Sequence, residues 1–445
     1  MNWLIDRFRD HAETVAFVHN GRKVSYGQVC GLVEGFGAEL AARKIAAGQK
    51  VVVVGDYSPE VFCMLLALAI QKCLVIPLSR QSVVEEDVAL QVCGSDWLVS
   101  FDEHGQSFEI VSKAIAVQND LLDGFLTKGH AGLILFSSGS TGAPKAILHD
   151  FERVAEKFHK QRSPLVTIPF LMIDHFGGIN TILAITSSLG TLVTIDDRSI
   201  PMLCSAIETY KVELLPVTPS FLNLLLLLRG HETHDLSSLR RITYGTEVMP
   251  QGTLDRLQKA FPGVVLQQTY GLSEVGVLHS QSRPDGSLWL RIGGQGFQTQ
   301  VRENILWIKS DYRMEGYLNA KSGFDDDGWF NTQDEVIVDG EWFKILGRVT
   351  DIINVGGQKV YPVEVENVIM GLDNIEDTAV FGEAHNILGQ IVVAKVRLRE
   401  PEEVDVLKKR IRAACLATLT SYKAPSKVII STESFNSVRQ KKVRK

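Results

Sequence analysis

Short apolar runs alternate with windows of helical periodicity over residues 1–350, and this alternation limits the possible folds more than any other feature. Strand-then-helix repetition of this kind is typical of a largely parallel sheet covered by helices. The sequence therefore predicts an α/β fold with a large N-terminal domain of packed mixed or parallel sheets and helices. Strands are expected at 50–56, 73–78, 132–138, 164–170, 190–196 and 212–218, and helices at 27–43, 58–71, 151–161, 200–210 and 251–260.

The pattern changes around residues 326–351, where turn residues, acidic residues and aromatics predict short hairpin strands. The following segment reads as a small α+β domain. Its expected elements are a helix opening at Tyr361-Pro362, strands near 376–382 and 389–398, a helix over 403–419 and a last strand at 427–431. A chain of 445 residues is too long for one ordinary core. We place the boundary at Asp351, which gives domains 1–350 and 351–445.

Charge and cysteine usage exclude several classes of protein. The net charge of −6 carries no basic excess that would favour nucleic acid as a partner. Six cysteines without close pairing argue against a disulfide framework and a zinc site, and they fit a reducing cytoplasm. The apolar stretches 61–70 and 221–228 are shorter than the roughly 20 residues that span a bilayer, and the N-terminus lacks the apolar core of a signal peptide. We expect a soluble, cytoplasmic protein.

A loop rich in glycine and hydroxyl residues follows the apolar run 132–135, and it reads FSSGSTGAPK over 136–145. Backbone N–H groups of such a turn, hydroxyls and a lysine can together hold phosphate. The spacing G-x-x-x-x-G-K-[ST] of P-loop phosphotransferases is absent, because Gly139 and Gly142 stand three apart and Lys145 follows Pro144. On its own, the loop could also be a Ser/Gly-rich turn without chemistry.

Residues 137–146 match the pattern [ST]-S-G-[ST]-T-G-x-P-K-[GA] and resemble the phosphate loop of the adenylate-forming (ANL) superfamily, which includes acyl-CoA synthetases, peptide-synthetase adenylation domains and luciferases. Other segments resemble further motifs of that superfamily in the right order across nearly the whole chain. They lie at 24–26, 72–78, 169–178, 244–247, 269–274, 331–334, 347–357 and 361–366. The ordered set is far more specific than any one motif, and the chain is identified as resembling the acyl-CoA synthetase and AMP-binding enzyme family.

The resemblance implies an acid–thiol ligase that uses ATP and Mg²⁺. A carboxylate attacks the α-phosphate of ATP, giving acyl-AMP and pyrophosphate, and the acyl group then passes to coenzyme A. One alternative transfers it to the phosphopantetheine of a carrier protein. A non-catalytic nucleotide-binding relative is the alternative of another class, because Gln333, Asn354 and Lys441 depart from the family pattern. The family also implies a small domain that moves, in a monomer or a homodimer.

Nucleotide binding is assigned by the resemblance to residues of these motifs. The loop would hold the leaving phosphates, Glu274 would bind Mg²⁺, Tyr270 would stack on adenine, and Asp334 would accept hydrogen bonds from the ribose hydroxyls. The full set is Ser137, Ser138, Gly139, Ser140, Thr141, Gly142, Lys145, Gly245, Thr246, Glu247, Thr269, Tyr270, Gly271, Ser273, Asp334 and Arg348.

Catalysis is assigned by the same resemblance to Lys442, Glu274 and His175. Lys442 aligns with the family's C-terminal lysine if Lys441 replaces a glycine, and Lys441 is the alternative. The expected acyl pocket is apolar and small, which favours an aliphatic or aromatic monoacid over an amino acid. The pocket residues are His175, Gly177, Gly178, Thr218, Gly245 and Leu272, and the hinge and thiol tunnel are Asp351, Gly356 and Gly357.

Overall fold

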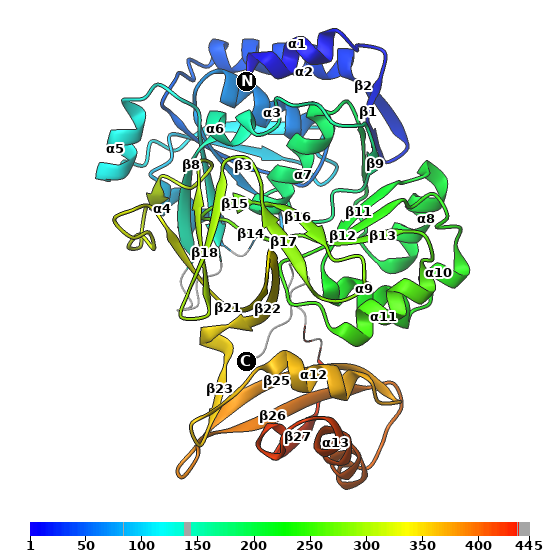
Figure 1. Cartoon of the computed structure of the whole chain (residues 1–445). Coiled ribbons are helices and arrows are strands. Elements are labelled where there is room, and N and C mark those ends of the chain that lie inside the picture. Colours follow the sequence, from blue (N-terminus) through cyan, green and yellow to red (C-terminus); the bar gives the residue numbers. More distant parts are fainter. Residues whose placement is uncertain (83, 138–143, 434, 436–445) are drawn as a thin grey trace.

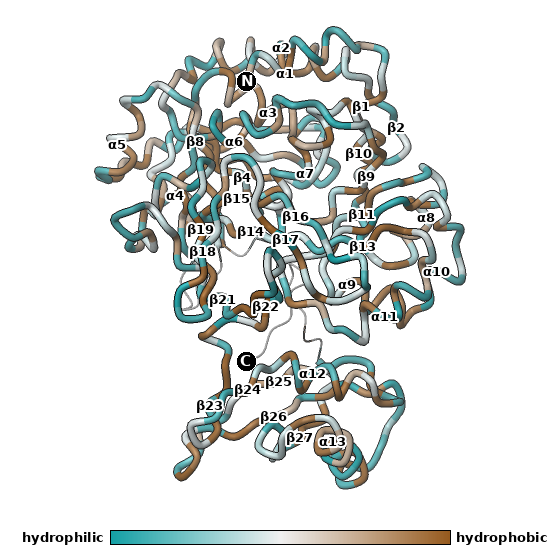
Figure 2. The backbone as a smooth tube through the Cα atoms, in the orientation of Figure 1, coloured by the Kyte–Doolittle hydropathy of each residue, from teal (hydrophilic) through white to brown (hydrophobic). Residues whose placement is uncertain are grey.

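A computed structural model describes the whole chain except residues 83, 138–143, 434 and 436–445. Figure 1 shows a large body and, beneath it, a smaller unit formed by the C-terminal part of the chain. Hydrophobic and hydrophilic stretches alternate along both parts (Figure 2), as expected for elements with one buried face.

The first large sheet has seven strands, of which the central four are parallel and the outer ones antiparallel. In spatial order they are β20 (Gly316–Tyr317), β8 (Lys145–Asp150), β7 (Gly132–Ser137), β4 (Leu74–Leu78), β3 (Lys50–Val54), β5 (Trp97–Phe101) and β6 (Phe108–Ser112). Helices α4 (Glu86–Cys93) and α5 (Asp120–Leu126) pack against its outer face.

The second large sheet also has seven strands, all parallel to their neighbours except the last. Its order is β13 (Val265–Gln268), β12 (Arg241–Tyr244), β11 (Leu214–Val217), β9 (Val166–Thr167), β10 (Thr191–Thr194), β1 (Val15–His19) and β2 (Arg22–Ser25). Its outer face is covered by α8 (Ile200–Tyr210), α9 (Pro219–Leu227), α10 (Gly230–Thr233) and α11 (Gln251–Ala260).

One hydrophobic core joins the inner faces of these two sheets. It contains α1 (Asn2–Arg9), α2 (Tyr26–Ala42), α3 (Pro59–Ile70) and α7 (Phe176–Ser187). Helix α3 is buried from Pro59 to Ala69 because both sheets flank it, and Ser58 caps its first turn by accepting a hydrogen bond from the Val61 N–H at 3.0 Å. Val51 and Val53 face this core whereas Val52 faces the outer one, the two-residue period of a strand.

A third sheet, antiparallel throughout, carries the chain toward the smaller unit and has its own core. Its order is β16 (His279–Ser282), β17 (Leu290–Gly293), β22 (Trp342–Arg348), β21 (Phe330–Asp339), β19 (Ile305–Ser310) and β18 (Phe297–Arg302). A short ribbon of β14 (Gly271–Leu272) and β15 (Gly276–Val277) precedes it. The 3₁₀ turn η1 (Val349–Asp351) follows it.

The smaller unit has a separate sheet and a separate core. Its elements are β23 (Ile353–Val355), β24 (Gln358–Val360), α12 (Pro362–Met370), β25 (Ile375–His385), β26 (Gly389–Leu398), α13 (Val404–Thr418), η2 (Ser421–Lys423) and β27 (Lys427–Ile430). The predicted α/β class with an added α+β unit is confirmed. The boundary at Asp351 and the motion of the unit stay predictions.

Candidate active site

The phosphate loop connects two antiparallel neighbours, β7 and β8, in which Ser137 lies opposite Lys145. Five residues assigned to this loop (Ser138, Gly139, Ser140, Thr141 and Gly142) lie outside the described residues. Helix α6 (Phe151–Glu156) follows β8 directly, with Asp150 accepting a hydrogen bond from the Arg153 N–H as its cap. It is shorter than the 151–161 window predicted from periodicity.

The far end of the loop is held by a segment from much later in the chain. The Asn319 Oδ1 atom accepts a hydrogen bond from the Ala146 N–H at 2.9 Å, and its Nδ2 group donates to the Pro144 carbonyl at 2.9 Å. The Leu318 N–H also donates to the Ala146 carbonyl, beside the β20–β8 pairing. Sequence reasoning missed this brace, since a lone asparagine after a short strand carries no motif.

Tyr317 joins the loop lysine to the predicted metal ligand. Its hydroxyl donates to Glu274 Oε1 at 2.7 Å, and the Lys145 Nζ atom lies 5.0 Å from the centre of its ring. Burial, and then the neighbouring Glu274 charge, raise the pKa of Tyr317 well above its ordinary value. The hydroxyl therefore stays protonated and fixes one carboxylate oxygen. Tyr317 is a functional candidate that sequence reasoning did not identify.

A second cluster surrounds Asp334, which is 7% exposed and stands opposite Arg348 in the β21–β22 ladder. The Tyr270 hydroxyl donates to Asp334 Oδ2 at 2.5 Å, and Arg348 Nε lies 3.4 Å from Oδ1. Burial raises the pKa of Asp334, while Arg348 and the Tyr270 hydroxyl oppose the rise. Tyr270 packs in the core of the third sheet and orients Asp334. Its predicted stacking on adenine stays a prediction.

The turn before Asp334 has a backbone conformation that favours glycine at position 333. Gln333 has φ +61°, the left-handed region that favours glycine. The Asn331 Oδ1 atom accepts the Gln333 N–H at 2.9 Å, and the Thr332 hydroxyl accepts the Asp334 N–H at 3.0 Å. These two hydrogen bonds hold the turn in the required conformation, so the departure from the family pattern leaves Asp334 in place.

The carboxyl ends of β12 and β13 bring together another group of predicted residues. A Cβ on Gly245 would lie 2.4 Å from the Thr269 hydroxyl oxygen, so only glycine fits there. The Thr269 N–H donates to the Tyr244 carbonyl at 2.7 Å, and Glu247 accepts a hydrogen bond from the Ser220 hydroxyl at 2.6 Å. The other predicted residues are nearby in the chain: Thr246 follows Gly245, Gly271 and Leu272 form β14, and Ser273 lies in the turn to β15.

His175 is the N-cap of α7. Its Nδ1 atom accepts a hydrogen bond from the Gly177 N–H at 3.0 Å, which leaves the proton of the neutral ring on Nε2. A Cβ on Gly177 would meet Leu171 at 2.6 Å, and one on Gly178 would meet the Met172 carbonyl at 2.0 Å. The small size of these glycines is therefore explained by close packing against protein atoms. Their role in the acyl pocket stays a prediction.

The remaining predicted residues lie apart from these clusters. Thr218 is fully buried and caps α9 by accepting the Phe221 N–H at 3.2 Å. Gly356 and Gly357 form the β23–β24 turn with φ +57° and +84°, and the Gly356 N–H donates to the Leu388 carbonyl of the same unit. Asp351 ends η1. The thiol-tunnel and hinge roles stay predictions, and Lys441 and Lys442 lie outside the described residues.

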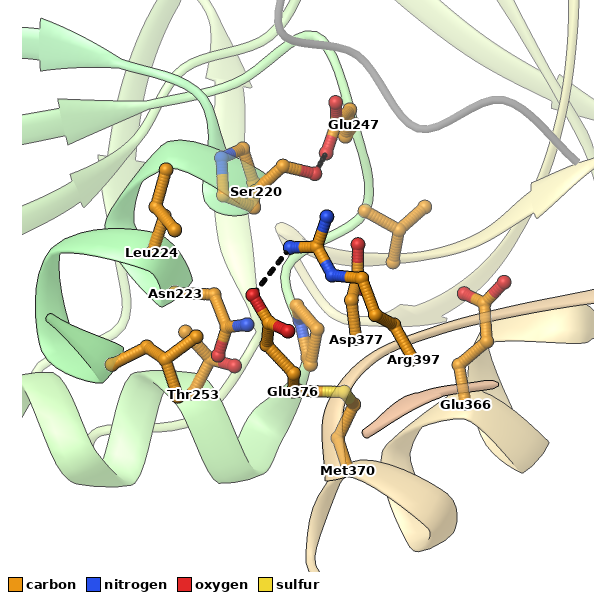
Figure 3. Close-up of a pocket in the computed structure, with 14 residues that line it drawn as sticks. Ser220, Asn223, Leu224, Glu247, Thr253, Glu366, Met370, Glu376, Asp377 and Arg397 are labelled. Atoms are coloured by element: carbon orange, nitrogen blue, oxygen red, sulfur yellow. Dashed lines mark hydrogen bonds and ion pairs between the residues drawn. The ribbon is translucent and has the colours of Figure 1, made fainter. Parts of the chain in front are cut away.

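The smaller unit meets the large body beside this site. Figure 3 shows a pocket between them, with Ser220 and Asn223 of α9 on one side and an ion pair of the smaller unit on the other. That pair joins Arg397 Nη2 to Glu376 Oε1 at 2.7 Å. Between the two parts, the Lys359 ammonium of β24 contacts the Glu335 carboxylate of β21 at 3.0 Å. This ion pair joins the smaller unit to the third sheet.

Neither a membrane span nor a metal cluster is found in the part of the chain that the structure describes. No helix there is long and apolar enough to cross a bilayer. No group of three or more His, Cys, Asp or Glu side chains among the described residues could hold a metal ion. All cysteines are buried free thiols.

Comparison with known proteins gives matches over nearly the whole chain. The sequence model of AMP-binding enzymes matches residues 5–302, and that of their C-terminal domain matches 364–442. Similar relatives include an indoleacetate–CoA ligase of Aromatoleum aromaticum, 26% identical over 93% of this chain and 90% of the relative. A 2-succinylbenzoate–CoA ligase of Listeria innocua is 25% identical over 96% of this chain and 95% of the relative. The crystal structure of an anthranilate CoA ligase with anthranoyl-AMP has a TM-score of 0.84 at 18% identity, covering 99% and 95%.

Proposed function

The chain belongs to the AMP-binding enzyme family and is an AMP-forming acid–thiol ligase, and from this premise we propose how its residues divide the work. The enzyme activates a carboxylic acid with ATP as an acyl-adenylate and then forms a thioester, with coenzyme A as the thiol. We place ATP where Lys145 opens β8, Glu274 lies in the turn between β14 and β15, and Asp334 lies within β21. We place the protein in the cytoplasm.

The observation that carries this proposal is that two clusters lie close together in the chain. One is suited to the leaving phosphates of ATP and the other to its ribose. Tyr317 joins Lys145 to Glu274 on the side of the leaving phosphates. Tyr270 and Arg348 hold Asp334 on the side of the ribose, and Tyr270 precedes Glu274 by only four positions in one turn. One nucleotide could therefore contact both clusters.

Mg²⁺ fits this site by the chemistry of its donors. Mg²⁺ keeps several waters and takes one or two protein carboxylates together with substrate phosphates. Glu274 is half-buried, and its Oε1 atom accepts the Tyr317 hydroxyl, which orients the carboxylate. The metal would neutralise charge that develops on the phosphates as pyrophosphate leaves.

The chain's own residues supply the remaining steps. Lys145 attracts the leaving phosphates, and Asp334 accepts hydrogen bonds from the ribose hydroxyls, so the α-phosphate is fixed in position. We place His175, the N-cap of α7, beside the incoming carboxylate. Lys442 would bridge that carboxylate and the α-phosphate, by its resemblance to the family lysine.

Thioester formation requires a second task from the smaller unit. Gly356 and Gly357 form a turn whose backbone can approach a thin pantetheine arm, and η1 at Asp351 is the place where the unit would rotate. In the pose described here that turn contacts Leu388 of its own unit. The phosphopantetheine of a carrier protein is the alternative thiol, since it has the same narrow arm as coenzyme A and could approach the same turn.

The test is ATP–pyrophosphate exchange over a panel of aliphatic and aromatic acids, followed by thioester analysis with coenzyme A and with a phosphopantetheinylated carrier protein. The proposal expects acid-dependent exchange, release of AMP, and a coenzyme A thioester. Absence of exchange with every acid would favour a non-catalytic nucleotide-binding relative. Release of ADP would favour a phosphotransferase.

A further inference from the structure

Lys157 occupies an unusual place for a lysine at the end of a surface helix. It follows α6 directly as the C-cap of that helix, and it is half-buried. Its Nζ atom donates to Asn180 Oδ1 at 3.1 Å and to the carbonyl of Val277. The rings of Phe158 and Phe297 lie 5.6 and 5.7 Å from it. The ammonium group is therefore enclosed by α6, α7, β15 and β18.

Two of these elements begin at the candidate active site. Helix α7 opens at His175, and Asn180 lies five residues along it, about 7.5 Å at the helical rise of roughly 1.5 Å per residue. Strand β15 begins two residues after Glu274 and ends at Val277. A Cβ on Gly276 would have the rings of Phe176 and Phe297 as its nearest neighbours, at 3.7 and 3.9 Å. Lys157 therefore contacts both elements that begin at the candidate site.

The charge around Lys157 is positive and lacks a counter-ion. No described acidic side chain forms an ion pair with it, and burial, with a contribution from Arg162, lowers its pKa to about 7. His279 of β16 lies in the same field, together with Arg162 and Arg291. An ammonium group has three N–H donors, and the two hydrogen bonds above use two of them. One donor is left for a ligand.

We propose that Lys157 closes the far end of the acyl pocket and recognises a second carboxylate on the substrate. The acid activated by this enzyme is then a dicarboxylic acid, with one carboxylate adenylated beside His175 and the other on Lys157. The spacing along α7 is of the order of that between the carboxylates of adipate or terephthalate. This inference rests on the proposed function, and it replaces the monoacid expected from the sequence, in which Lys157 had not been singled out.

The chemistry favours an anion over a neutral group at this position. An enclosed cation whose hydrogen-bond partners are neutral is costly, and a carboxylate would compensate its charge through a charge-assisted hydrogen bond. The rings of Phe158, Phe176 and Phe297 would contact the apolar body of the acid. The aromatic walls and the terminal cation together suit a rigid or extended diacid.

The test compares paired acyl-sulfamoyl adenosines that differ only at the far end of the acyl group. The pairs are hexanoyl against 5-carboxypentanoyl, and 4-methylbenzoyl against 4-carboxybenzoyl, measured by isothermal titration calorimetry on the full chain. For at least one pair, we expect the carboxylated member to bind about ten to a hundred times more tightly, the range of hydrogen bonds to charged groups. Lys157→Met should remove or invert the preference, and Lys157→Arg should retain it.

Lys160→Met is the matched control, because Lys160 lies three residues further along and is exposed. The Lys160→Met variant should prefer the carboxylated member of each pair as strongly as the unaltered enzyme does. Equal affinity for both members of each pair would overturn the proposal, as would an equal loss for both members in Lys157→Met. If Lys157→Met does not fold, the affinities of the paired ligands for the unaltered enzyme and for Lys157→Arg still test the proposal. Pyrophosphate exchange with free acids is scored separately: its absence overturns the proposed function, whereas unselective binding overturns only the role of Lys157.

Discussion

Removing the Tyr317 hydroxyl tests whether the phosphate loop and the carboxylate of Glu274 act as one unit. Tyr317→Phe keeps the ring beneath the Lys145 ammonium, so the cation–π contact at 5.0 Å is preserved. It deletes only the hydrogen bond of 2.7 Å to Glu274 Oε1. The raised pKa of Tyr317 means that this bond is present throughout the working pH range.

The expected size follows from the type of hydrogen bond. Bonds to charged groups contribute about 1.5–3 kcal/mol, and because both side chains are only half-buried we take the lower value. A loss of about 1.5 kcal/mol corresponds to roughly a tenfold fall in kcat/KM for MgATP in the exchange assay. The concentration of Mg²⁺ needed for half-maximal exchange should rise, since the carboxylate is no longer oriented.

A double-mutant cycle with Glu274→Gln isolates the pairwise contribution. We expect a coupling energy of about 1 kcal/mol or more between the two sites. Tyr312→Phe is the control, because its ring packs on Phe297 and the described residues give its hydroxyl no hydrogen bond. Additive effects in the cycle, or an equal loss in Tyr312→Phe, would refute the reasoning.

Three further outcomes are expected. Gln333→Gly should raise the free energy of unfolding, measured in urea, by about 0.5–1 kcal/mol. It relieves a left-handed residue that costs roughly 1–2 kcal/mol, and it adds the smaller entropy cost of glycine. A decrease in the free energy of unfolding would show that Gln333 is not strained. His149 is fully buried and burial lowers its pKa to about 3, so the unfolded chain binds a proton that the folded one does not. Stability should therefore fall by up to about 1.4 kcal/mol per unit as the pH drops from the ordinary value of about 6.5 toward 3, and a His149→Phe variant with an unchanged pH slope would rule this out. Lys442→Ala should strongly reduce adenylation, while thioester formation from supplied acyl-AMP is retained. Comparable losses in both half-reactions would contradict the assignment of Lys442 as the adenylation lysine.

The parallel strands and most helices could be predicted because their signal is local. The run 50–56 contains four consecutive valines followed by glycine, a pattern consistent with a fully buried strand, and the structure has β3 there. Helix α12 begins at Pro362 as expected, since proline suits the first turn. The fold class follows from the order of such elements, and each element was visible in its own window.

The parts that were missed depend on pairing between distant segments. Strand β20 and Asn319 brace the loop from a region that reads as an irregular connection, and Tyr317 reaches Glu274 only because of that pairing. Lys157 was not identified from the sequence, because its contacts come from the distant elements α7 and β15. Sequence motifs locate the residues predicted to bind the nucleotide more readily than the residues that position them.

The N-terminal hairpin of β1 and β2 has a consequence for synthesis on the ribosome. Strand β1 pairs with β10, and the His19 ring contacts Thr194, 175 residues later. At about 5–20 residues per second, the first strand waits on the order of ten to thirty seconds before its partner emerges. During that time Val15, Phe17 and Val24 have no sheet to cover them, so nascent chains should recruit chaperones early and fusions at this end should affect yield more than activity.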